Sequence, residues 1–447
     1  MKTIGIDIGT TTISAVVLET EEERVLAVRT IPNDSFMKSD YEWERVQDPA
    51  VIIDKARAAL DELLEQYPDV ISIGLTGQMH GIVYVDEAGR HLSPLYTWQD
   101  QRGNLPVFDG VSLVSCIKAS CGAAVSAGYG LVTHLYQCRR GGVPAGAVSL
   151  CTIPDYLGMI LTGRKTPLLH SSMAASLGFF DGRRGVFCGK QLEKLGMELS
   201  ILPQVTEEFA LLGYYKGRAV TAALGDNQAS FLGAVGLLEN TVLLNVGTGG
   251  QISVLSEQYF EKPGIEARPL TKGKYILVGS SLCGGRAYAI LEKFFRACVV
   301  AAGGKDGPQY EMMARLAAGA PSEDPMEVRT TFHGTRTQPK LRGAIRNLSE
   351  DNFTPEGLVQ GVLTGMAKEL YDLFYLIHEG TGMEAGRIVA SGNGVRKNAA
   401  LQRAFEEMFG AKLELARYEE EAACGAAICS SSAFSEEAAA KSKSDSP

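Results

Sequence analysis

Residues 3–12 read Thr-Ile-Gly-Ile-Asp-Ile-Gly-Thr-Thr-Thr, and this stretch decides which fold to expect. The apolar run that ends at Ile8 meets a glycine and three threonines, and residues 13–18 (Ile-Ser-Ala-Val-Val-Leu) then resume the apolar pattern. Two apolar runs joined by a short Gly-Thr segment predict a strand, a tight turn and a second strand. The chain is therefore expected to start with a β-hairpin whose turn carries small and hydroxylated side chains.

The same layout returns in the second half of the chain. Residues 241–246 form an apolar run, residues 247–250 read Gly-Thr-Gly-Gly, and residues 251–255 resume the strand pattern. The β pattern of this half starts earlier, at residues 219–224, directly before Gly225-Asp226-Asn227. Recurrence of one unit within a chain indicates internal duplication. We therefore expect an α/β protein made of two similar halves.

The length of 447 residues suits two domains of about 200 residues each. We place the N-terminal domain at residues 1–217 and the C-terminal domain at residues 218–434. Residues 435–447 (Ser-Glu-Glu-Ala-Ala-Ala-Lys-Ser-Lys-Ser-Asp-Ser-Pro) have the composition of a disordered tail. In the N-terminal domain, residues 49–66 show the apolar spacing of a helix.

Charge and composition exclude several classes of protein. The formal net charge of −9 disfavours binding to nucleic-acid backbones or to anionic lipid. The nine cysteines lack metal-type spacing, as in a protein with reduced thiols, and no apolar run approaches the length of a membrane span. We expect a cytoplasmic protein without nucleic-acid or membrane partners, and leave a homodimer as an alternative to a monomer.

The two Gly-Thr turns have the residues that phosphate binding requires. Converging backbone N–H groups need glycine and small side chains, and threonine hydroxyls add donors. The two turns are Gly9-Thr10-Thr11-Thr12 and Gly247-Thr248-Gly249-Gly250, whereas the G-x-x-x-x-G-K-[ST] pattern of P-loop proteins is absent. Either turn alone also fits an ordinary hairpin, but two turns at corresponding positions favour a phosphate site.

Two carboxylates stand next to these segments. Asp7 lies within an apolar strand, where burial is costly without a partner, and a Mg²⁺ ion carried by ATP phosphates would be a suitable one. The alternative is a carboxylate satisfied by neighbouring backbone N–H groups. Asp226 follows a strand end, where a carboxylate can orient an alcohol and accept its proton during phosphoryl transfer. Its alternative role is a helix N-cap.

Polar and aromatic residues suited to a sugar follow two further segments. Gln78-Met79-His80 comes directly after the apolar run at residues 70–75, and Trp98-Gln99-Asp100-Gln101-Arg102 lies further along the chain. Sugars are held by polar side chains that share hydroxyls and by an aromatic face against C–H groups. A structural histidine and a core tryptophan remain the alternatives for His80 and Trp98.

Together these segments resemble the motifs of the FGGY carbohydrate kinases, which belong to the superfamily of sugar kinases, chaperone ATPases and actin. The resemblance covers about residues 3 to 430. It rests on Asp7-Ile8-Gly9-Thr10-Thr11, Thr76-Gly77-Gln78-Met79-His80-Gly81, Gly225-Asp226-Asn227-Gln228-Ala229, Asn245-Val246-Gly247-Thr248-Gly249 and Ser391-Gly392-Asn393-Gly394 with Asn398. It implies two ribonuclease-H-like domains flanking a deep cleft, with sugar mainly on the first domain and ATP mainly on the second.

The resemblance also implies roles for individual residues. Asp226 would be the catalytic base, and Asp7 the carboxylate linked to Mg²⁺. The sugar would contact Gln78, Met79, His80, Trp98, Asp100, Arg102 and Asn227. ATP would contact Gly9, Thr10, Thr11, Thr12, Gly247, Thr248, Gly249, Gly284, Gly285, Gly392, Asn393 and Asn398.

Within the family, the Gln-Met-His-Gly and Thr-Trp-Gln-Asp segments look most similar to those of sedoheptulokinases, followed by xylulokinases. Ser14 stands where glycerol kinases place an arginine, which argues against glycerol as substrate. We therefore expect ATP-dependent phosphorylation of a terminal primary hydroxyl of a ketose, with sedoheptulose first and a pentulose second. The alternatives of other classes are a non-enzymatic ATP-binding sensor or scaffold, and an ATPase without a sugar acceptor.

Overall fold

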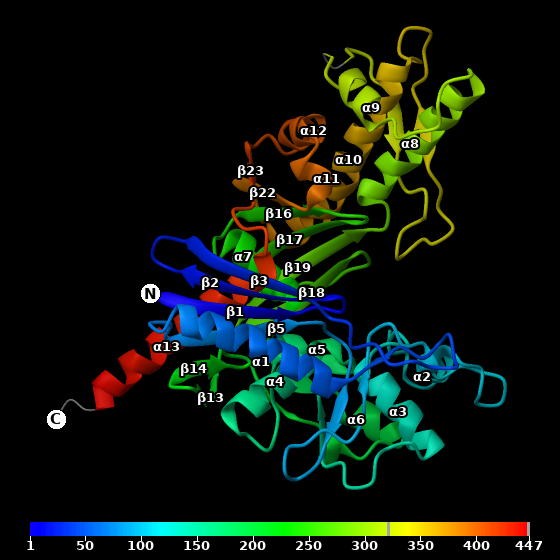
Figure 1. The fold of residues 1–447 in the computed structure, drawn as a ribbon. Coiled ribbons are helices and arrows are strands. Elements are labelled where there is room, and N and C mark those ends of the chain that lie inside the picture. Colours follow the sequence, from blue (N-terminus) through cyan, green and yellow to red (C-terminus); the bar gives the residue numbers. More distant parts are fainter. Residues whose placement is uncertain (320–321, 445–447) are drawn as a thin grey trace. The chain divides into compact units, whose positions relative to one another are not determined.

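The computed structural model describes residues 1–319 and 322–444, and the chain divides into two compact units (Figure 1). Unit 1 comprises Met1–Gly236, the short segment Arg268–Lys272 and the C-terminal segment from Tyr418 onward. Unit 2 comprises Leu237–Ala267 and Gly273–Arg417.

The central sheet of unit 1 is built around the predicted hairpin. In spatial order its strands are β13 (Leu211–Tyr215), β14 (Arg218–Thr221), β5 (Ser72–Gly77), β1 (Lys2–Ile8), β2 (Thr12–Glu19) and β3 (Arg24–Pro32), and β15 (Leu224–Gly225) also pairs with β5. β2 runs antiparallel to both of its neighbours, β1 and β3, whereas β5 runs parallel to β1 and β14 runs parallel to β5. The hairpin predicted at residues 3–18 is confirmed.

Successive residues of β1 point to opposite faces of this sheet. Ile4, Ile6 and Ile8 are fully buried in the same apolar core as helix α1 (Pro49–Gln66), which confirms the helix predicted at these residues. Gly5 lies between them and faces the other side, because successive strand residues point to opposite faces. There helix α13 (Glu421–Ser444) contacts β1 and β5 closely.

Glycines allow α13 to approach the sheet and helix α7 (Asp226–Val235). A Cβ atom added to Gly5 or to Gly74 would lie 1.8 Å from a carbonyl oxygen of α13. A Cβ on Gly233 of α7 would lie 2.0 Å from the carbonyl oxygen of Glu421, and one on Gly425 would lie 1.8 Å from that of Ala229. Helix α7, which begins with Asp226, is therefore held directly against the C-terminal helix.

Unit 2 repeats the strand order of unit 1. Its sheet runs β18 (Ile265–Thr271), β19 (Lys274–Ser281), β17 (Gly250–Ser256), β16 (Thr241–Val246), β22 (Arg387–Ser391) and β23 (Leu413–Leu415). The series β19-β17-β16-β22-β23 has the same order and strand directions as β3-β2-β1-β5-β14. This match confirms the predicted duplication. Helices α8 (Gly284–Ala301), α10 (Pro355–Thr381) and α12 (Ala399–Phe409) contribute to the apolar core of this unit.

The remaining elements are short. In unit 1 they are β4 (Val46–Gln47), β6 (Val83–Val85), β7 (Leu95–Tyr96), α2 (Leu113–Cys121), α3 (Gly130–Arg140), β8 (Ser149–Cys151), α4 (Ile153–Thr162), β9 (Leu168–His170), α5 (Ser171–Ser176), β10 (Phe180–Asp181), β11 (Val186–Phe187), α6 (Gly189–Lys194), β12 (Gln204–Thr206) and the 3₁₀ turns Arg102–Asn104 and Leu199–Ile201. In unit 2 they are α9 (Tyr310–Leu316), β20 (Glu327–Arg329), β21 (Ala344–Arg346) and α11 (Asn393–Arg396).

The division into units differs from the expected domain boundary after residue 217 for two segments of the chain. Residues 218–236 belong to unit 1, because β14 and β15 pair with β5 and α7 packs against α13. The C-terminal helix belongs to unit 1 for the same reason. Residues 435–444, expected in a disordered tail, continue α13, and their alanine-rich sequence favours helix. Residues 445–447 lie outside the described residues.

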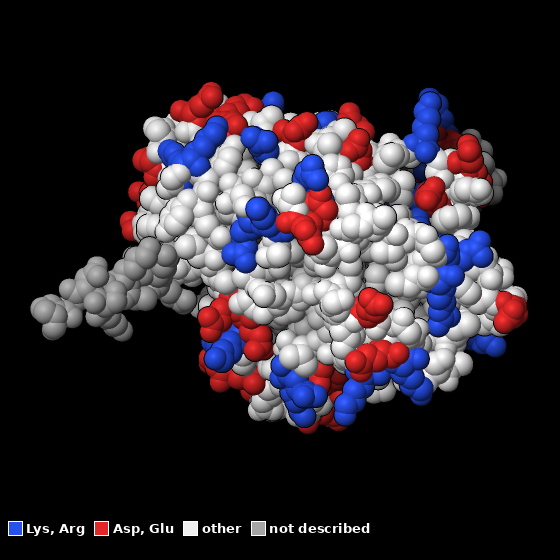
Figure 2. Space-filling model, turned by 90° about the horizontal axis from the view of Figure 1, so that it is seen from below, with Lys and Arg blue, Asp and Glu red and all other residues white. Residues whose placement is uncertain are grey.

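The surface carries charges of both signs. On the face drawn in Figure 2, acidic and basic side chains of the described residues are interspersed, as a net charge of −9 allows. Across residues 1–319 and 322–444, none of the helices combines the length and the apolar character that crossing a membrane requires.

Candidate functional site

Side chains from two loops hold the turn between β1 and β2. Asn33 donates its side-chain amide to the carbonyl of Gly9 and its backbone N–H to the carbonyl of Thr11, both at 2.8 Å. Gln47 Nε2 donates to the carbonyl of Thr10 at 2.9 Å. Three successive carbonyls of the turn are thus occupied, which leaves its N–H groups and threonine hydroxyls as donors for a phosphate.

Strand register brings Asp7 close to the segment that carries Asp226. Asp7 of β1 pairs with Thr76 of β5, and Thr76 pairs in turn with Leu224 of β15. Burial, together with the negative charges of Asp226 and Glu420, raises the pKa of Asp7 to about 7. Asp7 is therefore a carboxylate in a repulsive, acidic environment, which a bound cation would relieve.

Asp226 is the first residue of α7, and Gly225 occupies the N-cap position. The N-cap alternative considered for Asp226 is therefore not adopted. Burial raises the pKa of Asp226 to about 6, while the backbone N–H of Asn227 and the charge of Arg268 act in the opposite direction. A carboxylate with this pKa is mostly ionised at neutral pH and still accepts a proton readily, as a general base requires.

A buried serine and histidine hold the backbone just before Asp226. The N–H of Gly225 donates to Ser172 Oγ at 2.9 Å, and Ser172 Oγ lies 2.8 Å from His170 Nδ1. The backbone N–H of Ser172 also donates to Nδ1, so this nitrogen is an acceptor and the serine hydroxyl donates to it. Burial lowers the pKa of His170 to about 4, which keeps the ring neutral. Neither residue was predicted, because nothing in the local sequence links residues 170–172 to Gly225.

The Gln-Met-His segment packs against the same backbone. A Cβ atom on Gly225 would lie 2.8 Å from Met79 Cε and 2.9 Å from its Sδ, so Met79 contacts this glycine directly. His80 adopts a φ of 74°, which is uncommon for a residue with a side chain. Its ring nitrogen Nδ1 lies 2.7 Å from the carbonyl of Ser176, and the ring stacks on Tyr129 at 4.9 Å. Tyr129 is a third residue that sequence patterns did not predict.

The Trp98–Arg102 segment divides into an exposed and a buried part. Trp98 is 46% exposed and donates its indole N–H to Thr10 Oγ1 at 3.0 Å. Asp100 and Arg102 are buried and form an ion pair at 2.7 Å, with the Arg102 guanidinium 4.3 Å from the Tyr96 ring centroid. Asp100 also accepts the backbone N–H of Arg45 at 3.1 Å. These internal contacts make Asp100 and Arg102 supports of the loop that presents Trp98.

The remaining two predicted sugar residues are also held in place. Asn227 Oδ1 accepts from Arg268 Nη1 at 2.9 Å, which leaves the amide nitrogen of Asn227 as the donor group of this side chain. Gln78 is 4% exposed and donates its amide to Gln47 Oε1 at 2.9 Å. Unit 1 therefore gathers all of the predicted sugar residues together with Asp7, Asp226 and the first turn.

Backbone groups, in contrast, hold the second turn in unit 2. The N–H of Gly285 donates to the carbonyl of Gly247 at 2.9 Å, and the N–H of Arg286 donates to that of Thr248 at 3.0 Å. A Cβ atom on Gly284 would lie only 2.2 Å from the carbonyl oxygen of Gly249. Gly284 and Gly285 are thus required where the start of α8 meets the turn.

The segment at residues 392–398 reaches the same end of the sheet. Asn245 of β16 pairs with Ser391 of β22, and Gly392 follows with a φ of 87°. A Cβ on Gly392 would lie 2.6 Å from the carbonyl oxygen of Val246. Asn393 begins α11, whereas Asn398 caps α12 by accepting the N–H of Leu401 at 3.0 Å. All predicted nucleotide residues of unit 2 thus gather near the second turn, with Asn398 also serving as a cap.

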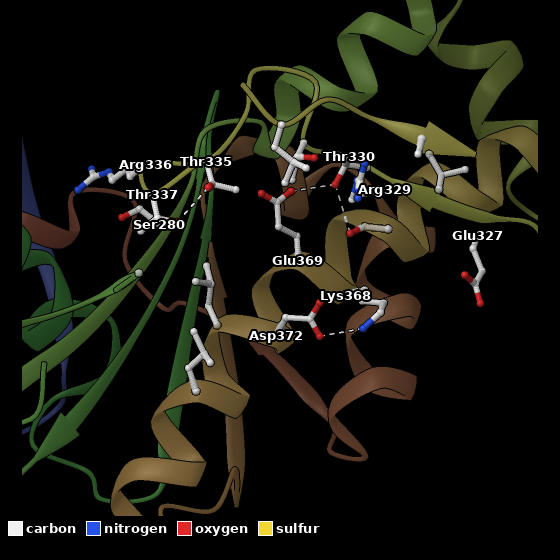
Figure 3. Close-up of a pocket in the computed structure, with 18 of the residues that line it drawn as sticks. Ser280, Glu327, Arg329, Thr330, Thr335, Arg336, Thr337, Lys368, Glu369 and Asp372 are labelled. Atoms are coloured by element: carbon white, nitrogen blue, oxygen red, sulfur yellow. Dashed lines mark hydrogen bonds and ion pairs between the residues drawn. The ribbon is translucent and has the colours of Figure 1, made fainter. Parts of the chain in front are cut away.

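Unit 2 also contains a cavity of about 840 Å³ that none of the predicted site residues lines. Figure 3 shows Lys368, Glu369 and Asp372 of α10 beside it, with Ser280 on the facing strand. Glu369 accepts from Thr330 Oγ1 at 2.8 Å, and burial raises its pKa. The cavity is separate from the segments expected to bind ATP.

Comparisons with known proteins agree with this arrangement. Residues 2–127 match the N-terminal domain of the FGGY family of carbohydrate kinases, and residues 242–434 match its C-terminal domain. The chain is 27% identical to a mouse (Mus musculus) sedoheptulokinase, covering 91% of this chain and 92% of that protein. It is 23% identical to a Haemophilus influenzae xylulose kinase, covering 95% and 89%. The crystal structure of xylulose kinase from Rhodospirillum rubrum has the same fold, with a TM-score of 0.80 and 24% identity over 96% of this chain and 89% of that chain. The chain belongs to the FGGY family of carbohydrate kinases and is a sugar kinase that uses ATP.

Proposed function

We propose that this sugar kinase transfers the γ-phosphoryl group of ATP to a terminal primary hydroxyl of a ketose. Sedoheptulose is the first candidate, supported by the mouse relative, and xylulose or another pentulose is the alternative, supported by the xylulose kinases. The observation that carries the proposal is the direct contact of Met79 with Gly225, which brings the sugar motif to the backbone that presents Asp226. Membership in a kinase family disfavours the sensor or scaffold alternative.

Asp226 is assigned the role of base in this proposal. It orients the sugar hydroxyl and accepts its proton as the phosphoryl group is transferred. Met79, His80, Trp98 and Asn227 are assigned to direct sugar contacts. Asp100 and Arg102 support the sugar site indirectly, because their charged groups bond to each other and to other residues of unit 1. Gln78 donates its amide nitrogen to Gln47, and its Oε1 is assigned to the sugar.

The residues around Asp7 fit a Mg²⁺ ion that arrives with ATP. The negative charges of Asp226 and Glu420 disfavour ionisation of Asp7, and a cation reverses that effect. The described residues contain no group of three or more His, Cys, Asp or Glu side chains spaced to hold a metal. Asp7 would hold the ion, which when bound neutralises phosphate charge.

ATP contacts are assigned to both Gly-Thr turns. The phosphates would bind the N–H groups of residues 9–12 and 247–249, and the adenosine part would contact residues 284–285, Gly392, Asn393 and Asn398. A cytoplasmic location and a homodimer stay predictions.

ADP release from Mg-ATP, measured with sedoheptulose, xylulose, ribulose and glycerol, tests the proposal. We expect the largest kcat/KM with sedoheptulose and almost none with glycerol. A preference for xylulose would move the assignment to the alternative, and stimulation by glycerol alone would overturn the ketose proposal. Residual hydrolysis by Asp226→Asn provides the background rate.

A further inference from the structure

Two buried glutamine amides connect the sugar motif to the first Gly-Thr turn. Gln47 lies on β4 and is fully buried, and Gln78 directly follows β5. Gln78 Nε2 donates to Gln47 Oε1, and Gln47 Nε2 donates to the carbonyl of Thr10, both at 2.9 Å. An unbroken chain of hydrogen bonds therefore runs from the Gln-Met-His segment to the middle of the turn.

The chemistry of the last acceptor fixes the orientation of both amides. A backbone carbonyl only accepts, so Gln47 must present its nitrogen to Thr10 and its oxygen to Gln78. Gln78 must then present its own nitrogen to Gln47. Rotation of either amide by 180° would bring two like groups together, so the orientation of one glutamine determines that of the other.

Thr10 receives a second contact from the sugar segments. Trp98, whose indole N–H reaches Thr10 Oγ1, lies on a loop that the buried Asp100–Arg102 ion pair supports. The carbonyl and the hydroxyl of Thr10 are thus each tied to a different segment assigned to the sugar. Because the hydroxyl only accepts in this contact, it keeps its own proton for a phosphate oxygen.

One atom of this chain of amides lacks a partner. Gln78 Oε1 is buried, and no hydrogen-bond donor reaches it from the described residues. A buried carbonyl oxygen without a donor is unfavourable, because it has lost its hydrogen bonds to water and gained none from the protein. A donor that arrives with a ligand would remove this cost and hold the Gln78 amide in the orientation that Gln47 requires.

We propose that Gln47 is a positioning residue that couples sugar binding to the first phosphate turn, an inference that rests on the assignment of Gln78 and Trp98 to the sugar site. A sugar hydroxyl, or a water that the sugar holds, donates to Gln78 Oε1 and fixes the amide chain. Gln47 then holds the carbonyl of Thr10, and the N–H groups of the turn stay aligned on the phosphates. Without sugar the alignment is weaker, so ATP hydrolysis stays slow.

The ratio of sugar-dependent to sugar-free ATP turnover measures this coupling directly. Gln47→Met keeps the size of the side chain but removes both hydrogen bonds. We expect it to lower the ratio about tenfold or more through kcat, with KM for the sugar changed less than about threefold. The acceptor is the sugar that stimulates the wild-type enzyme most, so an incorrect choice of ketose leaves this test intact.

Gln137→Met is the matched control. Gln137 is another buried glutamine of unit 1, and its amide donates to the Tyr96 hydroxyl at 2.9 Å without contacting either turn. This variant should show a similar loss of thermal stability and an unchanged turnover ratio. Equal ratios in Gln47→Met, Gln137→Met and wild type would overturn the coupling.

A double-mutant cycle separates a shared chain from two independent effects. If Gln78 acts through Gln47, the double variant Gln47→Met/Gln78→Met loses no more of the ratio than the larger single variant. Additive losses would contradict the proposal even if each variant is impaired. Absence of stimulation of the wild-type enzyme by every sugar would instead overturn the proposed function together with the coupling, which distinguishes the two failures.

Discussion

The two Gly-Thr turns occupy equivalent places in equivalent sheets, yet different kinds of groups hold them. The carbonyls of the first turn accept from the side chains of Asn33 and Gln47 as well as from a backbone N–H. The carbonyls of the second accept from backbone N–H groups at the start of α8. Asp7 lies next to the end of the first strand of its hairpin. The residue at the corresponding position of unit 2 is the uncharged Asn245.

This difference indicates how a duplicated fold specialises. Side-chain support can be altered one residue at a time, and it ties the first turn to segments assigned to the sugar. Backbone support depends on the close approach of the start of α8 to the turn. It ties the second turn to segments assigned to the nucleotide. The conformation of the first turn can therefore depend on the sugar, whereas the second turn gives the phosphates a binding site of fixed conformation.

The largest expected effect comes from Asp226, the carboxylate that is assigned as the base and that lies in the same unit as the first turn. Asp226→Asn keeps the shape of the side chain but removes the proton acceptor, so kcat should fall by about 10³-fold. KM for ATP should change little, because the second turn is untouched. Steady-state kinetics with the preferred sugar check this, and near-normal turnover of the folded variant would rule out the role as base.

Glycine substitutions test the backbone support of the second turn. Gly284→Ala places a Cβ against the carbonyl of Gly249, so we expect a loss of about 1–3 kcal/mol in stability and a raised KM for ATP. Gly307→Ala is the matched control, because a Cβ at Gly307 meets nothing within 4 Å and this residue is outside the segments assigned to ATP. Thermal melting and nucleotide titration of both variants should differ clearly, and equal behaviour would contradict close packing as the cause.

The pH dependence of stability tests the contrast between Asp7 and Asn245. The folded-state pKa of Asp7 is raised to about 7, above the ordinary value of 3.8. Its protonated form favours the folded state, so this contribution is full below pH 4 and is lost as the pH rises through 7. Relative to Asp7→Asn, the wild-type chain should lose about 4 kcal/mol between pH 4 and 8 when nucleotide and Mg²⁺ are absent. Urea unfolding at several pH values measures it, and parallel curves would contradict the raised pKa.

The smallest expected effect concerns the side-chain support of the first turn. Asn33→Ala removes the bond from the side chain to Gly9 but keeps the backbone bond to Thr11, so stability should fall by about 1 kcal/mol. KM for ATP should rise modestly, whereas the sugar-to-background turnover ratio should stay closer to wild type than in Gln47→Met. A fall in the ratio as large as that of Gln47→Met would show that any weakening of the turn uncouples the sugar.

The sequence predicted the parts of the fold and site that local patterns encode. The two hairpins, the helix at residues 49–66 and the duplication follow from apolar periodicity and from the repeated Gly-Thr turns, and the structure confirms them. The supports Gln47 and Ser172 were not predicted, because each contacts a residue more than 30 positions away, and His170 acts through Ser172. The division into compact units differs from the expected boundary for a related reason: β14 and α13 join unit 1 through long-range contacts that periodicity does not reveal.

The close approach of α13 to unit 1 has a consequence for biosynthesis. Chains emerge from the ribosome N-terminus first, and domains usually fold as they emerge. Here the helix that packs on Gly5, Gly74 and α7 follows all of unit 2 in the chain and is made after it. A nascent chain that already contains Asp226 therefore still lacks the helix against which α7 packs. The kinase should acquire activity only after α13 has been synthesised, and chains that stop before α13 should not consume ATP.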